Sequence, residues 1–154
     1  MPSASVLLPL WGYLALVSVP LAVIDLRERR LPDRLVLPGY GFAAVSLARD
    51  AAERAGPPAG ALAAAVLSLA AMLLLHIAGG AGLGDVKLAG VLGAGLGLLG
   101  WSALALGAAL AFVSAGVAAA VLLVVRGTPA RGARIAFGPS LLAGFWGAPL
   151  LTAS

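Results

Sequence analysis

The sequence contains no cysteine and a single histidine, His76, among its 154 residues. Without cysteine, the chain can form neither a disulfide framework nor a thiolate zinc site, and it has no cysteine nucleophile. One histidine cannot supply a multi-histidine metal site. We therefore expect a protein that uses neither a metal nor another cofactor.

Charged residues are also scarce. They make up 10% of the chain, against 62% for hydrophobic residues, whereas soluble domains usually contain about 25% charged residues. Such a chain cannot expose most of its surface to water, so we interpret it as a multi-pass membrane protein with the lipid bilayer as a partner. The net charge of +4 could indicate nucleic-acid binding. We expect none, because basic residues in a membrane protein usually reflect its orientation.

The first hydrophobic stretch lies close to the N-terminus, in MPSASVLLPLWGYLALVSVPLAVID. No basic residue precedes it, and no clear small-residue cleavage site comes before the first charges. We expect this stretch to be a retained transmembrane helix and not a signal peptide.

Four clusters of charged residues, at 25–34, 49–54, 85–87 and 126–134, divide the chain into hydrophobic stretches. The stretches are Val6–Ile24, Leu35–Ala48, Ala59–Ala78, Val86–Val125 and Ile135–Ala153. A membrane-spanning helix needs about 20 residues, so Val86–Val125 is too long for one crossing and should turn back near 96–101, where glycines can break the helix. The pattern predicts an all-α bundle of six transmembrane helices.

Two of these helices are short. Leu35–Ala48 and Val86–Leu99 have 14 residues each, or about 21 Å against a hydrocarbon core of about 30 Å. Their ends are predicted to extend into the neighbouring charged clusters, or the bilayer to thin locally.

The basic residues are distributed unevenly between the two faces of the predicted bundle. The connections after the first, third and fifth helices hold eight of the ten: Arg27, Arg29, Arg30, Arg34, Lys87, Arg126, Arg131 and Arg134. The positive-inside rule places this face in the cytoplasm and both termini outside. Asp25 and Asp85 then lie on the same, cytoplasmic, face.

Two aspartates at the same depth in the membrane, on different helices, are the least that aspartyl proteolysis requires. Carboxylates that are held close together share one proton. The ionised carboxylate can take a proton from water while the protonated one polarises the scissile carbonyl. This chemistry requires no metal and no covalent intermediate, in agreement with the absence of cysteine and of histidine clusters.

Three segments of the sequence resemble the signature segments of the type IV prepilin peptidase family. They are DLRERRLPD (25–33), GLGDVKL (82–88) and IAFGPSLLAG (135–144), and they occur in the order and spacing of that family. Many members also have an N-terminal methyltransferase domain that contains cysteines. This chain resembles the short, peptidase-only form associated with tight-adherence or Flp-type pili, so residues 1–154 should form a single domain.

The resemblance implies that Asp25 and Asp85 are the catalytic pair of a membrane aspartyl endopeptidase. The family removes the short basic leader of prepilins and pseudopilins at the cytoplasmic face of the cell membrane, just before a hydrophobic helix. Gly82 and Gly84 could be simple turn residues or could allow close approach of a substrate strand. Lys87 is a candidate for shaping the site, or its side chain reaches lipid phosphate.

Other interpretations of these residues remain open. Asp85 could be a simple helix N-cap, and Asp33 competes with Asp25 for the second catalytic place. We expect Asp33 to cap the second helix. Lys87 should form no ion pair with Asp85, because residues two apart lie on nearly opposite faces of a helix. A lone histidine such as His76 is more often a packed, hydrogen-bonded residue than a catalyst.

The sequence departs from the family pattern at two places. Leu31-Pro32-Asp33 replaces Ile-Pro-Asn, and Ala136 stands where the family usually has proline. We therefore assign no catalytic role to residues 137–139.

Two other functional classes compete with the leader peptidase. An intramembrane protease of the presenilin kind shares the Gly-x-Gly-Asp pattern, but it requires a Pro-Ala-Leu segment that is missing here. A small transporter or channel would use its acidic residues to bind protons or cations, and it predicts at least one carboxylate at mid-membrane. The sequence leaves open the oligomeric state and the identity of the prepilin.

Overall fold

The computed structural model describes residues 2–28, 30–126 and 137–152. Within these ranges the chain forms six α-helices and no β-strand, which confirms the predicted all-α fold with six helices. The helices are α1 (Ala4–Glu28), α2 (Asp33–Arg54), α3 (Ala59–Ile77), α4 (Leu83–Leu99), α5 (Trp101–Arg126) and α6 (Gly138–Thr152).

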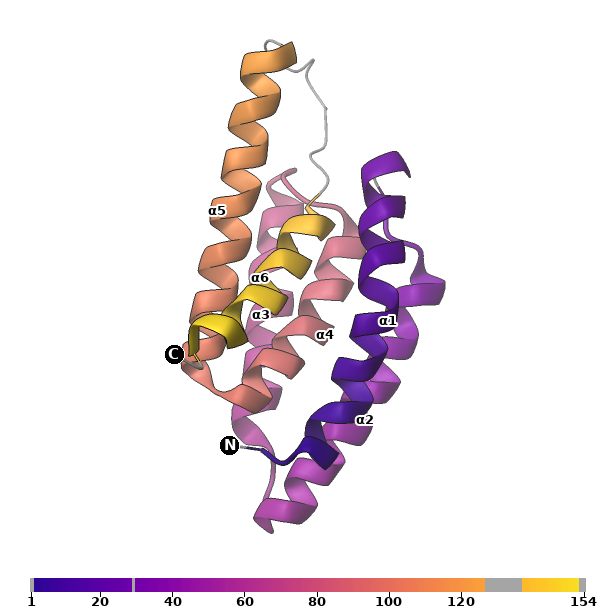
Figure 1. Ribbon diagram of the computed structural model, residues 1–154, viewed down its shortest axis with the longest axis vertical. Helices are drawn as coiled ribbons and strands as arrows, with labels where there is room; N and C mark the ends of the chain where they lie inside the picture. Colours follow the sequence, from indigo (N-terminus) through magenta and orange to yellow (C-terminus); the bar gives the residue numbers. More distant parts are fainter. Residues whose placement is uncertain (1, 29, 127–136, 153–154) are drawn as a thin grey trace.

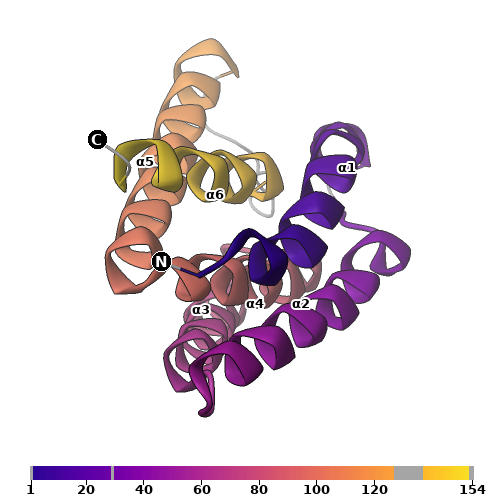
Figure 2. The same cartoon turned by 60° about the horizontal axis from the view of Figure 1, so that its bottom comes forward.

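Successive helices run in opposite directions and form three hairpins, α1–α2, α3–α4 and α5–α6 (Figure 1). Figure 2 shows α1 and α2 on one side of the bundle, with α5 and α6 on the other. α4 contacts all five other helices, and 12 of its 17 residues are buried. We call the end that holds the C-terminal turns of α1, α3 and α5 the upper end, as in Figure 1, and the opposite end the lower end.

Three of the described helices, α1, α3 and α5, are long and apolar enough to cross a membrane. This finding corrects the prediction of six transmembrane helices. α4 and α6 have only 17 and 15 residues, which at 1.5 Å per residue gives about 25 and 22 Å, less than the hydrocarbon thickness. α2 carries charged residues in both its first and last turns. These three helices depend on packing against the others.

The charged clusters between the hydrophobic stretches belong partly to the helices. α2 continues beyond the stretch Leu35–Ala48 at both ends, and α4 begins at Leu83, ahead of Val86. Both observations confirm the predicted helix extensions. The chain turns between α4 and α5 at Gly100, whose φ of +122° favours glycine, inside the predicted range 96–101.

Small residues bring two pairs of helices into close contact. A Cβ atom on Gly97 of α4 would lie 2.5 Å from the Cβ of Ala64 in α3. A Cβ atom on Gly144 of α6 would collide with the carbonyl oxygen of Gly107 in α5. Only glycine allows either approach, as in helix pairs packed in lipid. The bundle therefore contains two close pairs, α3–α4 and α5–α6.

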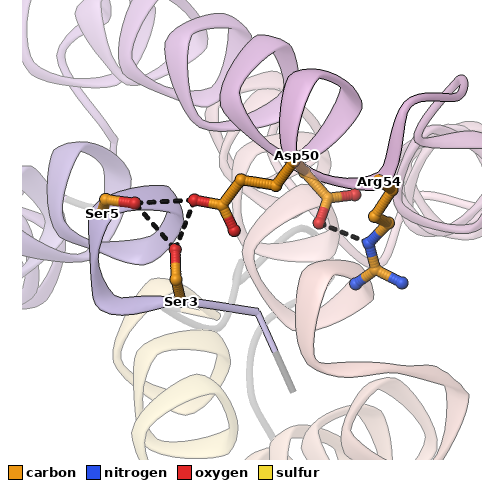
Figure 3. A network of polar contacts seen from close by, with 5 residues as sticks. Ser3, Ser5, Asp50 and Arg54 are labelled. Carbon is orange, nitrogen blue, oxygen red and sulfur yellow. Dashed lines mark hydrogen bonds and ion pairs between the residues drawn. The ribbon is translucent and has the colours of Figure 1, made fainter.

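Hydrogen bonds fasten the beginning of α1 to the end of α2 at the lower end of the bundle (Figure 3). The hydroxyl groups of Ser3 and Ser5 donate to the carboxylate of Glu53. One turn away, Arg54 pairs with the buried carboxylate of Asp50 at 2.6 Å. The hydrogen bonds of Ser3 and Ser5 thus link the start of α1 to α2, and the ion pair lies within α2.

A proline creates a further link between these two helices. Pro9 has no backbone N–H, so the carbonyl oxygen of Ser5, four residues earlier, has no partner within the helix. The guanidinium of Arg49 in α2 donates a hydrogen bond of 2.8 Å to this oxygen. The arginine therefore satisfies a backbone group that the helix itself leaves open.

Candidate active site

Asp25 lies in the last turn of α1 and is 3% exposed. Its Oδ2 atom accepts a hydrogen bond of 2.9 Å from the backbone N–H of Gly138, the first residue of α6. The first N–H groups of a helix have no partner within it and favour a negative charge nearby. Asp25 therefore accepts a hydrogen bond from the first N–H group of α6, in addition to lying at the end of α1.

Asp85 lies in the first turn of α4 and is 6% exposed. Its Oδ2 atom accepts a 2.9 Å hydrogen bond from the backbone N–H of Gly82, which is the N-cap residue. The other oxygen, Oδ1, is buried and has no hydrogen-bond partner within the described part of the chain. Helix capping thus accounts for one carboxylate oxygen of Asp85 and leaves the second available for another purpose.

The side chain of Leu31 connects the surroundings of the two aspartates. A Cβ atom on Gly84 would lie 2.7 Å from the Cβ of Leu31, and one on Gly138 would lie 3.4 Å from its Cδ2. The structure therefore brings the two aspartates to the same end of the bundle, as the charge pattern predicts.

The two glycines of the Gly-x-Gly-Asp segment have different surroundings. Gly82 provides the N–H group that binds Asp85. Gly84 leaves space for Leu31, because an added Cβ would also lie 3.2 Å from the backbone nitrogen of that residue. The residue that approaches Gly84 closely is Leu31 of the same chain.

Lys87 forms an ion pair with Asp33 of α2. Its Nζ atom lies 2.8 Å from each carboxylate oxygen. Tyr40 adds a second link between α2 and α4, since its hydroxyl donates a hydrogen bond of 2.7 Å to the carbonyl oxygen of Lys87. These contacts agree with the expectation that Lys87 does not pair with Asp85.

The predicted capping role of Asp33 is wrong. The N-cap of α2 is Pro32, and no side chain makes a capping hydrogen bond there. Asp33 is already inside the first turn, where its carboxylate pairs with Lys87 of another helix. Its negative charge still suits the N-terminal end of α2.

His76 has the packed environment that the sequence suggests. Its Nδ1 atom lies 2.8 Å from the carbonyl oxygen of Ala81, between α3 and α4. Within the described ranges, no group of three or more His, Cys, Asp or Glu residues could hold a metal ion.

Sequence reasoning missed two residues that shape the surroundings of the aspartates, Gly138 and Leu31. The segment Phe137-Gly138-Pro139 carries a signal for a helix start, because proline is tolerated in the first turn of a helix. Nothing in that signal identifies Asp25 as the partner of the free N–H group. The contacts of Leu31 likewise depend on how three helix ends meet.

Comparisons with known proteins identify the family of this chain. Neither the curated proteins nor the solved structures include a match to this sequence. Residues 12–124 match the type IV leader peptidase family. The matched range contains Asp25 and Asp85 and covers well over half of the 154 residues. The chain therefore belongs to the type IV leader peptidase family.

Proposed function

We propose that this protein is a membrane aspartyl endopeptidase that removes the short basic leader of type IV prepilins or pseudopilins, with Asp25 and Asp85 as its catalytic pair. One observation carries the proposal. Two buried carboxylates from different helices lie at the same end of the bundle, and a backbone N–H group holds one oxygen of each. Family membership independently supports leader-peptidase activity.

The proposed chemistry uses one proton that the two carboxyl groups share. The ionised carboxylate takes a proton from water as the water oxygen attacks the scissile carbonyl carbon. The protonated carboxyl group gives its proton to the carbonyl oxygen, which produces a tetrahedral diol. The C–N bond then breaks as the leaving nitrogen accepts a proton from one carboxyl group and a diol hydroxyl returns its proton to the other.

The residues around the pair act as positioning groups in this proposal. The N–H groups of Gly82 and Gly138 each occupy the Oδ2 atom of one aspartate, so the second oxygen of each remains for water or substrate. Lys87 acts indirectly, because its ion pair with Asp33 holds the first turn of α4 against α2. Gly84 keeps Leu31 seated between the two helix starts.

The proposal includes an orientation in the cell membrane. The upper end, where Asp25 and Asp85 lie, faces the cytoplasm, and both termini lie outside. Basic residues at helix ends on this side, such as Arg27, Arg34 and Lys87, support the assignment by the positive-inside rule. In this orientation the two aspartates meet the basic leader of a prepilin at the cytoplasmic face of the membrane, in the manner of a short, peptidase-only, tight-adherence or Flp-type enzyme.

The position of the carboxylates disfavours a transporter or channel. Such a protein needs an acidic group near the middle of the membrane. Asp25 lies in the last turn of α1 and Asp85 in the first turn of α4, so both sit near helix ends.

Co-expression with a candidate prepilin tests the proposed function. The wild-type chain should shorten the prepilin by its leader, seen as a size shift on a gel. The variants Asp25→Asn and Asp85→Asn should each abolish the shift, because neither pair can then share a proton between two carboxyl groups. Asp33→Asn should retain it. Full processing by either of the first two variants would refute the assignment of the catalytic pair.

A further inference from the structure

An apolar cavity of about 80 Å³ lies between α3, α4, α5 and α6. Ser68 provides the one polar side chain among its described lining residues. Ala71 of α3 and Ala108 of α5 line it and are also exposed, so the cavity opens outward between these two helices. Both are long and apolar enough to cross a membrane, and the opening therefore faces the hydrocarbon region.

The walls of the cavity continue directly from the turns that hold the two aspartates. Ala89 lines the cavity one helical turn beyond Asp85 in α4. Leu141 lines it three residues beyond Gly138, the hydrogen-bond donor to Asp25. One turn of helix rises about 5 Å, so the cavity begins within one turn of both carboxylate-binding positions.

An aromatic contact lies at the same end of the cavity. The ring of Phe112, which lines the cavity, packs edge-to-face on that of Phe137 at a centroid distance of 5.7 Å. Phe137 immediately precedes Gly138. The upper end of the cavity is thus joined to Asp25 through α6 as well as to Asp85 through α4.

Below this point the cavity follows α4 toward the lower end. Ala89, Gly93 and Leu96 line it and fall on one face of the helix. From the first to the last, α4 rises about 10 Å. The cavity therefore runs from the depth of the carboxylates toward the membrane interior, with apolar walls of small and aliphatic side chains.

We propose that the mouth of this cavity is the docking groove for the hydrophobic helix that directly follows the cleavage site of the substrate, with one apolar side chain of that helix seated in the cavity itself. The inference rests on the proposed function. A prepilin cut beside Asp25 and Asp85 continues past the cut as an apolar helix, and that helix must enter the hydrocarbon region from the depth of the carboxylates. The cavity begins at that depth, runs in that direction and opens laterally between α3 and α5, so the helix enters from the bilayer.

Matched substitutions at the opening test the groove. Ala71→Phe and Ala108→Phe fill the mouth, whereas Ala70→Phe and Ala109→Phe place the same side chain on neighbouring exposed positions that do not line it. We expect the first two to raise the KM for a full-length prepilin about tenfold, the equivalent of losing a modest apolar contact. The two controls should behave as wild type.

A second substrate separates docking from chemistry. A soluble peptide that contains the leader and ends soon after the cleavage site has no helix to dock. All four variants should cleave it with the wild-type kcat/KM. If the groove variants lose activity on this peptide as well, their defect lies in folding or in the site, and the docking proposal is overturned.

Cross-linking provides a direct measurement, because the chain contains no cysteine. Single-cysteine variants Ala108→Cys and Ala109→Cys are combined with a prepilin that carries one cysteine early in its hydrophobic segment. We expect a disulfide-linked adduct with the first variant and not with the second. Equal yields of adduct with the two variants would overturn the proposal. Labelling of the Ala108→Cys variant by a photoactivatable phospholipid, without an adduct to the prepilin, would assign the cavity to lipid and overturn the proposal as well.

These outcomes distinguish a failure of the proposed function from a failure of the docking groove. If the wild-type protein does not cleave any prepilin, the proposed function fails. If it cleaves and the groove variants match their controls, the proposed function stands and the docking groove alone is wrong.

Discussion

The carboxylate of Asp25 accepts a hydrogen bond of 2.9 Å from the backbone N–H of Gly138, a residue 113 positions further along the chain. This bond joins the last turn of the first helix to the first turn of the last helix. The position of one candidate catalytic carboxylate is therefore set by the packing of α6 and not by its own segment.

The substitution Gly138→Ala should impair cleavage while leaving the protein folded. The N–H group remains, but the added Cβ would lie 2.8 Å from Oδ2 of Asp25, so the carboxylate has to move. A displacement of about 1 Å at a catalytic group can cost on the order of a hundredfold in rate. We expect a fall in kcat of about tenfold or more and a changed pH profile, with nearly unchanged thermal unfolding.

Gly116→Ala in α5 is the matched control for this measurement, because an added Cβ there meets no heavy atom within 4 Å. It should keep wild-type kinetics. Wild-type kcat and pH dependence in Gly138→Ala would show that the hydrogen bond to Asp25 has no positioning role.

The substitutions Gly84→Ala and Gly82→Ala should differ in their effect on stability. A Cβ on Gly84 would lie 2.7 Å from the Cβ of Leu31 and 3.3 Å from its carbonyl oxygen, and backbone atoms cannot move away easily. Overpacking of this kind costs about 1–3 kcal/mol. A Cβ on Gly82 would lie 3.3 Å from Oδ2 of Asp85, a movable side-chain atom. Unfolding in detergent followed by circular dichroism should show a clearly lower midpoint for Gly84→Ala, and equal midpoints would contradict this account.

The ion pair between Lys87 and Asp33 should contribute little energy to holding α4 against α2, and therefore little to cleavage. Both side chains are partly exposed, at 39% and 54%, and exposed ion pairs are worth less than about 1 kcal/mol. Lys87→Ala and Asp33→Ala should each reduce cleavage only a few-fold, and the charge-swapped double variant Lys87→Asp with Asp33→Lys should recover part of the loss. A double-mutant cycle on kcat/KM measures this coupling. Complete inactivity of Lys87→Ala beside an active Asp33→Ala would instead indicate a direct role of Lys87 at the site.

The fastening of the N-terminus should weaken in acid. Hydrogen bonds from the hydroxyl of Ser3, and then from that of Ser5, hold the pKa of Glu53 below its usual value. A carboxyl group whose pKa is lower in the folded state stabilises the fold above its unfolded pKa, and the contribution disappears as the pH falls through the folded pKa. Amide exchange at the start of α1, corrected for its intrinsic pH dependence, should therefore rise as the pH is lowered below about 4.

The variant Glu53→Gln serves as the reference for this experiment, since its side chain has no charge to lose. Its exchange at the start of α1 should be independent of pH across the same range. The same acid-induced rise in the variant and in the wild type would assign the effect to another group.

Hydrophobic stretches and their interrupting charges predict the six helices correctly, because each stretch is long enough to pack as a helix and glycine marks the turn at Gly100. Their prediction of six membrane crossings is wrong. The length of a hydrophobic stretch predicts a helix, but α4 and α6 are too short to span the bilayer by themselves. These two helices are buried by neighbouring helices, which the sequence pattern does not reveal.

The placement of Asp25 and Asp85 at one end follows from the alternating direction of successive helices, which a count of stretches supplies. The partners of those carboxylates do not follow from it. Gly138 and Asp25 are 113 residues apart in the chain. Asp33 forms an ion pair instead of a cap, because the first turn of α4 brings Lys87 beside it. Such contacts depend on how separate helices pack, which no local pattern contains.

The arginine that bonds to the carbonyl oxygen left open by Pro9 has a consequence for the electrical asymmetry of the molecule. Arg49 and Arg54 are the basic residues of the lower end, and internal acceptors engage both, one a backbone oxygen and the other a buried carboxylate. The carbonyl oxygen that Arg49 holds is uncharged, so this arginine keeps its full positive charge, whereas Arg54 is balanced by Asp50. Ion pairs balance Arg30 and Lys87 at the upper end in the same way, so the difference in positive charge between the two ends rests on their unequal numbers of basic residues.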